Sequence, residues 1–388
     1  MTNVAKNSKI EKSPGRIARY MERNRATDGN YLLKRDIMRV AVGSFTIVLL
    51  FGLCFLILQP LLHQFSNSIM SRYDLLDPLV IAIPREPTFA NYRLASQLMS
   101  YWPNFGAMST GLERFFYEFD FGEATFREII GVPGQVWRII VEHSGALVNT
   151  FWITALVSVL QIVACTLVAY GFARFEFPLK RFWFACVILT VLVPPQVIRV
   201  PMFLNFHFFD FFGLVTLFGD PINLTGSLSG YLMLSVTAMG LRNGLYIFML
   251  RQYFRNMPKE LEESAWVDGC GKLRTFVQIM IPDALPMLVS CFLFAFVWQW
   301  TDGFFTSMFL HDYGVMAVQM AGLGEEFAFD HVRQVAAATG THGTRPDLSM
   351  IEAMISTGVL MGIIPIIIIY LVAQRFFVEG IGQSGIKM

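Results

Sequence analysis

Long uncharged runs alternate with short polar segments along the chain. Residues 40–62 carry no charge over 23 positions and residues 146–173 carry none over 28, so each run can cross a hydrocarbon core of about 30 Å as a helix. Six runs have this apolar character: 40–62, 146–173, 182–206, 229–250, 284–310 and 353–374. The pattern predicts an all-α integral membrane protein with six transmembrane helices.

The third run, 182–206, is interrupted by proline. Pro194 and Pro195 each lack a backbone N–H, and a proline disfavours helix in the residue before it. Backbone groups that are freed at membrane depth persist only where protein or water satisfies them. We therefore expect Pro194, Pro195 and Gln196 to line a translocation path or an interface with another membrane subunit.

One polar segment, residues 251–284, is rich in charge although apolar runs flank it on both sides. Pro258 suits the first turn of a helix, and the positive end of that helix favours a carboxylate such as Glu263. Gly269 fits the left-handed position that ends such a helix, and a second short helix can follow over about 272–282. The result is a helix–Gly–helix bracket between two spans, a shape that suits docking to another protein. We call residues 251–284 the bracket.

Lysine and arginine are unevenly distributed among the polar segments. With both termini in the cytoplasm, the cytoplasmic segments hold 20 Lys and Arg, whereas the opposite segments hold 8. The positive-inside rule therefore favours both termini, and with them the bracket, in the cytoplasm. The predicted organisation is a basic cytoplasmic arm (1–39), a first span (40–62), an extracytoplasmic loop or small helical cap (63–145), and a core of five spans (146–388) that includes the bracket (251–284) and a cytoplasmic tail (375–388).

Composition narrows the function classes. Charged residues make up 15% of the chain and hydrophobic residues 54%, which excludes an ordinary soluble domain, and the net charge of +1 argues against a nucleic-acid partner. The five cysteines imply no disulfide framework, and the six histidines lack metal-ligand spacing, so no metal site is expected. A Gly-x-x-x-x-Gly-Lys-Ser/Thr phosphate loop is absent from the sequence. We therefore expect a non-catalytic chain that holds no cofactor of its own.

Four polar or aromatic residues inside the predicted spans are candidates for a pore. Arg199 and Arg242 are costly in a membrane, so they either face a cavity or extend towards the interface and pair with a carboxylate such as Asp210 or Asp220, or with a partner. Trp300 and Asp302 offer a stacking face and a hydrogen-bond acceptor for a sugar. The alternative for Trp300 is an anchor at the membrane interface.

The spacing within the bracket resembles a known motif. Glu263-Ser264-Ala265 is followed by Gly269, then by nine residues and Ile279-Met280-Ile281-Pro282. This is similar to the glutamate-alanine-alanine loop of the permease subunits of binding-protein-dependent ABC importers, with Ser264 replacing the first alanine and Ile281 a leucine. Asp268 before the glycine resembles the carbohydrate-uptake branch, and the chain is most similar to the smaller permease subunit of maltose-type importers.

The resemblance implies a fold, a location and a set of partners. The fold would be that of type I importer permeases, multi-pass in the bacterial cytoplasmic membrane. The partners would be a second homologous permease, two cytoplasmic ATPase subunits that bind ATP and Mg, and an extracytoplasmic solute-binding protein that delivers a sugar or oligosaccharide. The loop at 311–352 would touch the binding protein, and the tail would reach the ATPase dimer interface.

The bracket would then be the coupling loop, with a helix seated in a cleft of one ATPase. Its coupling residues would be Glu263, Ser264, Ala265, Asp268, Gly269, Ile279 and Pro282. Because Ser264 and Ala265 are small, a large residue at either position is expected to clash with that cleft. The rival hypothesis is a self-sufficient secondary transporter or channel with Arg199, Arg242 and Asp302 as an ion relay. A secondary transporter has no need of the bracket.

Overall fold

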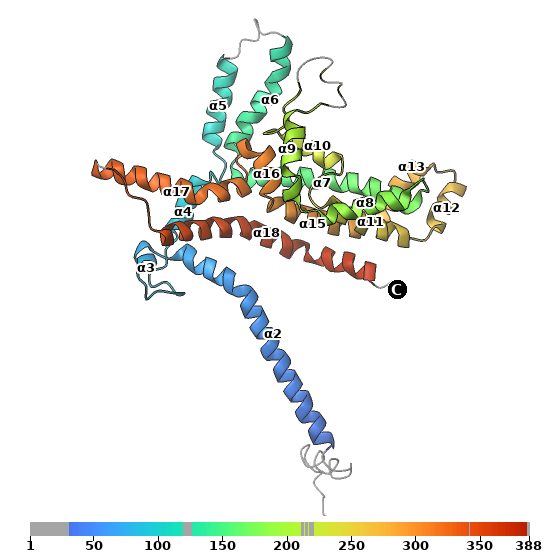
Figure 1. Cartoon of the computed structure of the whole chain (residues 1–388), viewed down its shortest axis with the longest axis horizontal. Coiled ribbons are helices and arrows are strands. Elements are labelled where there is room, and N and C mark those ends of the chain that lie inside the picture. Colours follow the sequence, from blue (N-terminus) through green and yellow to red (C-terminus); the bar gives the residue numbers. More distant parts are fainter. Residues whose placement is uncertain are drawn as a thin grey trace, which may run out of the picture. The chain divides into compact units, whose positions relative to one another are not determined.

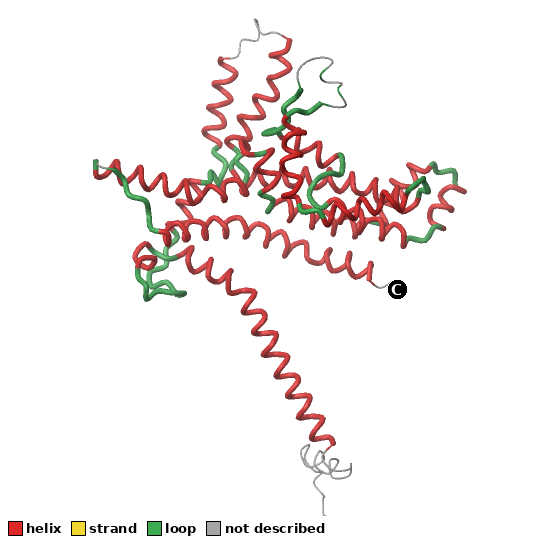
Figure 2. Tube along the Cα trace, in the orientation of Figure 1, coloured by secondary structure: helices red, strands yellow, loops and turns green. Residues whose placement is uncertain are grey.

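The computed structural model describes residues 31–118, 126–210, 213, 216, 221–340 and 342–385, and most of them are helical (Figure 2). Within these residues the β structure consists of one isolated antiparallel bridge between Phe209 and Ile222. The chain divides into two compact units, residues 1–63 and 64–388. The two units are described separately.

The first unit is dominated by one long helix. Helix α2 (Tyr31–Ile69) begins before the predicted span at 40–62 and continues past its end into the second unit. Its apolar side chains lie on all sides of the helix, which suits surroundings of lipid or of other membrane helices. Residues 1–30 of the basic arm lie outside the described residues.

Helix α7 (Ala146–Arg174) is central to the second unit (Figure 1). It packs against α10 (Leu228–Val236), α11 (Asn243–Asn256) and α15 (Leu285–Trp300). About half of its most apolar window is buried within the protein, which is far more than a helix surrounded by lipid would show. Helix α7 therefore provides the common wall on which the other helices of this unit assemble.

A second layer forms around the C-terminal helix. Helix α18 (Leu348–Gly385) packs against α15, against α17 (Met316–Thr339) and against α4 (Ala90–Leu98). Helix α17 occupies most of 311–352, where the sequence predicts a loop. Its buried residues Met316 and Leu323 join the same hydrophobic cluster as residues of α18, so the segment is part of the packed protein.

Three helices, α2, α7 and α18, are long and apolar enough to cross a membrane, and two bent pairs raise the number to five among the described residues. One bent pair is α8 (Lys180–Leu192) with residues 195–207, at 100°. The other joins the bracket to α15, at 75°. The run at 229–250 forms α10 and α11 instead of one helix, because Ala238 and Arg242 adopt positive φ angles that no α-helix contains.

Residues 63–145 contain further helices, of which α5 (Phe105–Glu118) and α6 (Phe126–His143) pair as a hairpin (Figure 1). The chain then enters α7 through Gly145, whose φ is +79°. A Cβ atom at this position would lie 2.5 Å from the backbone carbon of Trp102. Glycine is therefore required here both by its conformation and by its neighbour.

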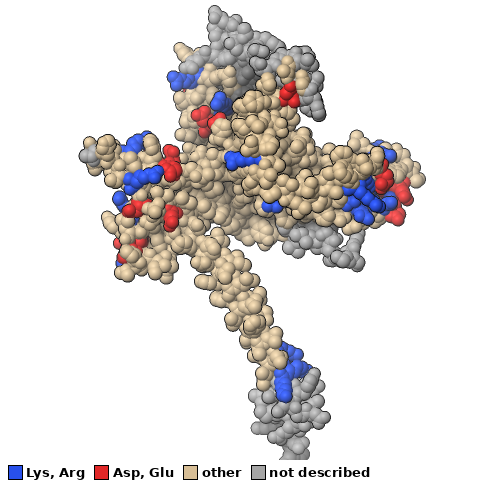
Figure 3. Space-filling model, in the orientation of Figure 1, with Lys and Arg blue, Asp and Glu red and all other residues tan. Residues whose placement is uncertain are grey.

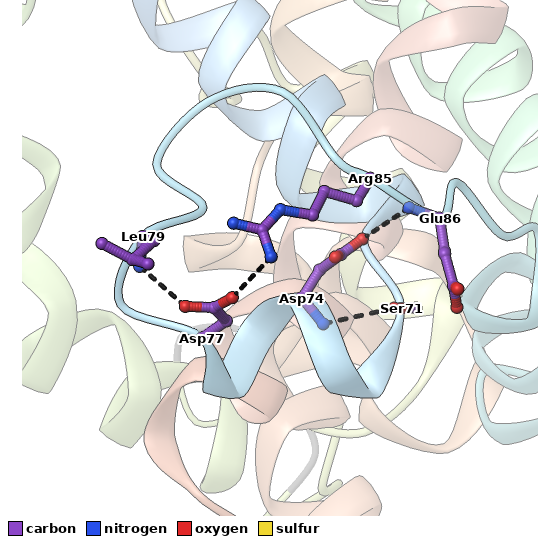
Figure 4. Close-up of polar contacts among 6 residues, drawn as sticks. All are labelled: Ser71, Asp74, Asp77, Leu79, Arg85 and Glu86. Carbon is purple, nitrogen blue, oxygen red and sulfur yellow. Dashed lines mark hydrogen bonds and ion pairs between the residues drawn. The ribbon is translucent and has the colours of Figure 1, made fainter.

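A short helix, α3 (Arg72–Leu76), organises the loop that precedes α4 (Figure 4). The Ser71 hydroxyl accepts a hydrogen bond from the N–H of Asp74 (3.2 Å), which caps the helix. The buried carboxylate of Asp74 accepts from the N–H of Glu86 (3.0 Å), and Arg85 pairs with Asp77 at 2.9 Å. These bonds hold the two ends of the loop together.

Charged side chains gather at two ends of the second unit (Figure 3). One group surrounds α12 (Glu260–Val267) and α13 (Lys272–Thr275), and the other surrounds α3 and α17. Further charged side chains lie on the α5–α6 hairpin, and the rest of the surface between the two groups carries few charges in this view. This sparsely charged surface suits the hydrocarbon core of a bilayer, with a polar region on each side.

Candidate functional site

The first helix of the bracket, α12, begins at Glu260, with Lys259 in the N-cap position. Pro258 therefore precedes the helix and does not occupy its first turn. Glu260, Glu262 and Glu263 all lie in that first turn, where the positive end of the helix dipole favours carboxylates. Local electrostatics thus stabilise α12 at this end.

Gly269 ends the first helix with a φ of +82°, as predicted from the sequence. A Cβ atom built at this position would have no heavy atom within 4 Å. Conformation, and not lack of space, therefore requires glycine here. The chain then turns into α13, a π-helical turn η2 (Phe276–Met280) and α14 (Ile281–Asp283).

A hydrogen bond joins the first residues of the bracket, at the end of α11, to its last residues. The Tyr253 hydroxyl donates to the backbone oxygen of Asp283 (3.0 Å). Burial, together with the nearby Asp283 carboxylate, raises the pKa of Tyr253 above its ordinary value. The hydroxyl therefore stays protonated at neutral pH and remains available as the donor.

A buried ion pair joins the bracket to α7. Arg174 Nε, on the last residue of α7, lies 3.3 Å from Glu262 Oε2, and the two side chains are only 7% and 6% exposed. The Tyr170 hydroxyl donates to Glu262 Oε1 (2.9 Å), and Arg174 Nη2 donates to the backbone oxygen of Met257 (3.0 Å). We call Tyr170, Arg174 and Glu262 the clamp. Through Glu262 the clamp holds the first turn of α12. Through Arg174 it also holds the backbone of Met257, which directly follows α11.

Aromatic packing surrounds the clamp. The Tyr170 ring lies 4.5 Å from the ring of Phe276 and 5.6 Å from that of Phe254. Phe276 belongs to the second half of the bracket and Phe254 to α11, so one side chain of α7 contacts both ends of the bracket. Removal of water around the ion pair strengthens its electrostatic interaction. The bracket is therefore joined to the end of α7 by both polar and aromatic contacts.

The predicted coupling residues do not all face the same way. Glu263, Ser264 and Asp268 are exposed. Ala265 is only 3% exposed within this chain. A larger residue there would therefore clash first with the protein itself. The clash with a partner's cleft that the sequence predicted at this position is corrected accordingly. Of the last two predicted coupling residues, Ile279 is half-buried in η2 and Pro282 is exposed in α14.

Four large apolar side chains are exposed on the bracket among its charged residues, and the sequence pattern did not single them out. Val267 is 88% exposed and Leu273 75% exposed, and Trp266 and Val277 are also exposed. These residues precede and follow the turn at Gly269. We call Trp266, Val267, Leu273 and Val277 the docking face, because exposed apolar patches rimmed by charge mark interaction sites.

The proline break in the third run lies where the sequence predicts it. Helix α8 ends at Leu192, and Val193 and Pro194 are extended, as residues that precede proline are expected to be. Pro195 then starts a short 3-10 helix that contains the exposed Gln196. The chain therefore turns sharply here without a continuous helical backbone.

Arg199 and Arg242 make aromatic contacts instead of ion pairs with the described residues. The Arg199 guanidinium lies 5.5 Å from the ring centre of Phe304, and that of Arg242 lies 3.8 Å from Trp298. Both arginines are exposed on the surface of this chain. Asp220, one of the carboxylates considered as a partner, lies outside the described residues.

Trp300 and Asp302 lie inside the protein. Trp300 is 1% exposed, and its Nε1–H donates to the backbone oxygen of Gly362 in α18 (3.1 Å), so it is not an anchor at the protein's surface. The Asp302 carboxylate accepts from the N–H groups of Phe304 and Phe305 at 3.0 and 3.1 Å. Asp302, which precedes the N-cap residue Gly303, thus satisfies the first two N–H groups of helix α16 (Phe304–Phe309).

A chain of buried polar side chains extends from Asp302 across the core. Tyr231 hydrogen-bonds both Asp302 and Gln299, and Gln299 Nε2 donates to Gln161 Oε1 (2.9 Å). Gln161 in turn bonds Asn243 at the start of α11. The chain joins α10, α15, α7 and α11. Asp302 was a candidate from the sequence, whereas the connection to Gln161 and Asn243 depends on how the helices pack and has no signal in the sequence.

The family described as "Binding-protein-dependent transport system inner membrane component" matches residues 161–378, which is more than half of the chain. The chain belongs to this family. The matched residues include the bracket, the proline break and Arg199, Arg242, Trp300 and Asp302.

Individual relatives agree with the family. The probable ABC transporter permease protein YurM of Bacillus subtilis is 27% identical over 244 residues, which cover 63% of this chain and 70% of YurM. The melibiose/raffinose/stachyose import permease protein MelC of the same organism is 28% identical over 245 residues, which cover 62% of this chain and 75% of MelC.

A solved structure of a bacterial ABC transporter that imports the acidic polysaccharide alginate has a chain with the same fold. The TM-score is 0.57 at 19% identity, and the match covers 88% of this chain and 98% of that one. The chain is therefore a membrane-spanning permease subunit of an ATP-driven importer. Subunits of this family are generally not the catalytic part of the transporter.

Proposed function

We propose that this permease forms one half of a translocation path for a sugar or oligosaccharide and transmits ATP-driven motion through the clamp. Six spans would carry the path: α2, α7, the broken α8–α9 (Arg199–His207) pair, α10 with α11, α15 and α18. The observation that carries the proposal is the buried bond network between Glu262, Tyr170 and Arg174. A passive surface loop would need no such attachment.

The proposed sidedness follows from charge. The end of the second unit that carries α12 and α13 would lie in the cytoplasm together with both termini. A reporter that is active only in the cytoplasm should work when fused after Arg25 or Lys387 and should be silent at Gly111. Activity at Gly111 would overturn both the sidedness and the six-span topology.

The docking face would seat in a cleft of a cytoplasmic ATPase subunit. Its exposed apolar residues flank the turn at Gly269 along the chain, and the exposed carboxylates of Glu263 and Asp268 belong to the same segment. Movement of the ATPase would then reach α7 directly, because the clamp leaves little freedom between α12 and the end of α7. ATP and Mg would be bound by the ATPase and not by this chain.

The path itself would pass the break at Pro194, Pro195 and Gln196, together with the second, homologous permease. Arg199 and Arg242 are exposed on this chain and stacked on aromatic rings, so each could meet substrate or the partner permease. The buried Trp300 and Asp302 would support the path from behind. A solute-binding protein would approach the opposite end, near α17.

The substrate class rests on the relatives. MelC is named for import of melibiose, raffinose and stachyose, and the structural neighbour imports alginate. The substrates in both names are saccharides. We propose a carbohydrate for this permease as well.

The decisive experiment replaces one residue of the docking face. Leu273→Glu places a charge where we propose an apolar cleft, whereas Leu79→Glu, at an equally exposed leucine outside the bracket, is the matched control. We expect Leu273→Glu to lose the co-purifying ATPase and transport while the permease still inserts in the membrane. Transport by the purified chain without any ATPase would instead favour the secondary-transporter hypothesis.

A further inference from the structure

A basic surface cavity lies where the end of α7, the start of α8 and the end of α11 meet. Its volume is about 700 Å³. Its lining includes six cations but a single carboxylate, that of Glu176; the cations are Arg174, Lys180, Arg181, Arg251, Arg255 and Lys259. We call this the basic cavity. So strong an excess of one charge in a concave surface calls for an anion.

Two of the six cations already have a partner. Arg174 pairs with Glu262 in the clamp, and Lys180 Nζ lies 3.0 Å from Glu176 Oε1. Within the described part of the chain, Arg181, Arg251, Arg255 and Lys259 have no carboxylate within ion-pair distance. Four uncompensated positive charges therefore share one cavity.

Arg251 provides a second, independent indication of an anionic ligand. Its guanidinium lies 3.9 Å from the ring centre of Phe184, and its Nε–H is buried without a hydrogen-bond partner in the described structure. Arg255 is four residues further along α11, so two like charges occupy the same helix face. A buried donor and two adjacent like charges are both stabilised if a phosphate lies between the arginine forks.

The rim of the cavity favours a lipid over a soluble anion. Phe182 and Trp183 at the start of α8 are both more than half exposed, and tryptophan is enriched where a helix meets the membrane interface. Leu189 and Leu192 are exposed further along the same helix. A head group in the cavity would therefore have an apolar helix surface beside it for its acyl chains.

We propose that the basic cavity binds the phosphate head group of an anionic phospholipid of the cytoplasmic leaflet. This inference rests on the proposed cytoplasmic position of the bracket. Lys259 is the residue directly before α12 and Arg174 belongs to the clamp, so the bound lipid would contact the base of the coupling loop. The lipid would neutralise repulsion beside the clamp and hold α8, α11 and the bracket together.

The test uses the assembled importer in nanodiscs of mixed phosphatidylcholine and phosphatidylglycerol, with retained lipids identified by native mass spectrometry. We expect phosphatidylglycerol to be retained in preference. In the variant Arg251→Gln/Arg255→Gln, the ratio of retained phosphatidylglycerol to phosphatidylcholine should fall about five-fold for each charge removed. Each Lys or Arg near an anionic lipid surface contributes about that factor to binding. Arg333→Gln/Arg345→Gln removes two exposed arginines elsewhere and should leave the preference unchanged.

Two more variants keep the result interpretable. Arg251→Lys/Arg255→Lys keeps the charge and should retain most of the preference for phosphatidylglycerol. Arg181→Gln, at an exposed position, should lower this preference about five-fold, and it provides a test even if the double glutamine variant fails to fold. Equal retention of the two lipids by the unmodified importer would overturn the proposal. Full displacement of phosphatidylglycerol by inorganic phosphate would also overturn it, because the cavity would then bind a soluble anion. Loss of the ATPase from the double glutamine variant with unchanged lipid retention would overturn it too, because the cavity would then bind a protein. Lipid retention needs neither transport nor ATP hydrolysis, so a failure of the proposed import function would register separately.

Discussion

Arg174 and Arg242 are both located at the end of a helix, and the protein uses them in opposite ways. Arg174 ends α7, is buried, and pairs with Glu262. Arg242 precedes α11 with a φ of +58°, is exposed, and lies over Trp298 without a carboxylate partner in the described residues. The first arginine is committed to the internal structure of the permease, whereas the second remains available to a ligand or to another subunit.

The difference teaches that position in an apolar run is a poor guide to the role of a charge. Arg242 interrupts an uncharged run and is conspicuous in the sequence. Arg174 follows the end of such a run, where an arginine is common. Only the pairing across the structure shows that Arg174 is the buried one. Breaking the pair should therefore cost far more than removing the conspicuous arginine.

The largest effect is expected from cutting the clamp. Arg174→Met or Glu262→Leu leaves an uncompensated buried charge, which costs about 3–5 kcal/mol. The thermal midpoint of the purified importer should fall strongly, and stimulation of ATP hydrolysis by substrate should be lost. The double variant Arg174→Met/Glu262→Leu should recover part of the stability, because no unpaired charge remains, but not the stimulation.

The matched control is the exposed pair formed by Glu176 and Lys180. Because Glu176 is 88% exposed, Glu176→Leu should change stability by no more than about 1 kcal/mol. If Arg174→Met were as mild as Glu176→Leu, the clamp would not be a structural joint.

The next largest effect concerns the turn of the bracket. Gly269→Ala forces a side chain into a left-handed conformation at a cost of about 1–2 kcal/mol, although the added methyl group meets no neighbour. Gly271→Ala is the control, since Gly271 has a φ of −71° and equally open surroundings. Coupled ATP hydrolysis should fall in the first variant and stay normal in the second. Equal behaviour of the two variants would show that the left-handed turn is not needed.

A smaller effect on stability is expected at Arg242. Arg242→Gln removes a cation–π contact worth about 0.5–1 kcal/mol at an exposed site, so the thermal midpoint should move little. Transport measured in vesicles decides its role. A fall in transport with unchanged stability would place Arg242 on the path or at the partner permease, whereas normal transport would leave it a surface residue.

The smallest perturbation is Gln196→Cys, at an exposed position in the proline break. Stability should be unchanged, and a small aqueous thiol reagent should label the new cysteine in at least one nucleotide state. The buried Cys165 and Cys291 are internal controls that should stay unlabelled, and the parent protein gives the background from its other cysteines. Complete protection in every nucleotide state would count against a path at the break.

Local sequence was sufficient for the elements that depend on backbone chemistry. Adjacent prolines at 194 and 195 predicted the break after α8, and Gly269 between two short amphipathic stretches predicted the turn of the bracket. The same reasoning failed at residues 237–242, where no proline marks the break between α10 and α11. Positive φ angles at Ala238 and Arg242 interrupt the helix there, and neither residue type favours such an angle.

The sequence by itself therefore determined that this is a helical membrane protein, where its apolar runs lie, and that a helix–Gly–helix bracket interrupts them. These features follow from hydrophobicity and backbone preference, which act within one or two turns of helix. Only the tertiary structure decided that Glu262 is the buried carboxylate of the bracket and Glu263 the exposed one, and that Ala265 faces inward. Glu262 meets Tyr170 across 92 residues of chain, and such a contact arises from how helices pack and not from any property of the residues beside it.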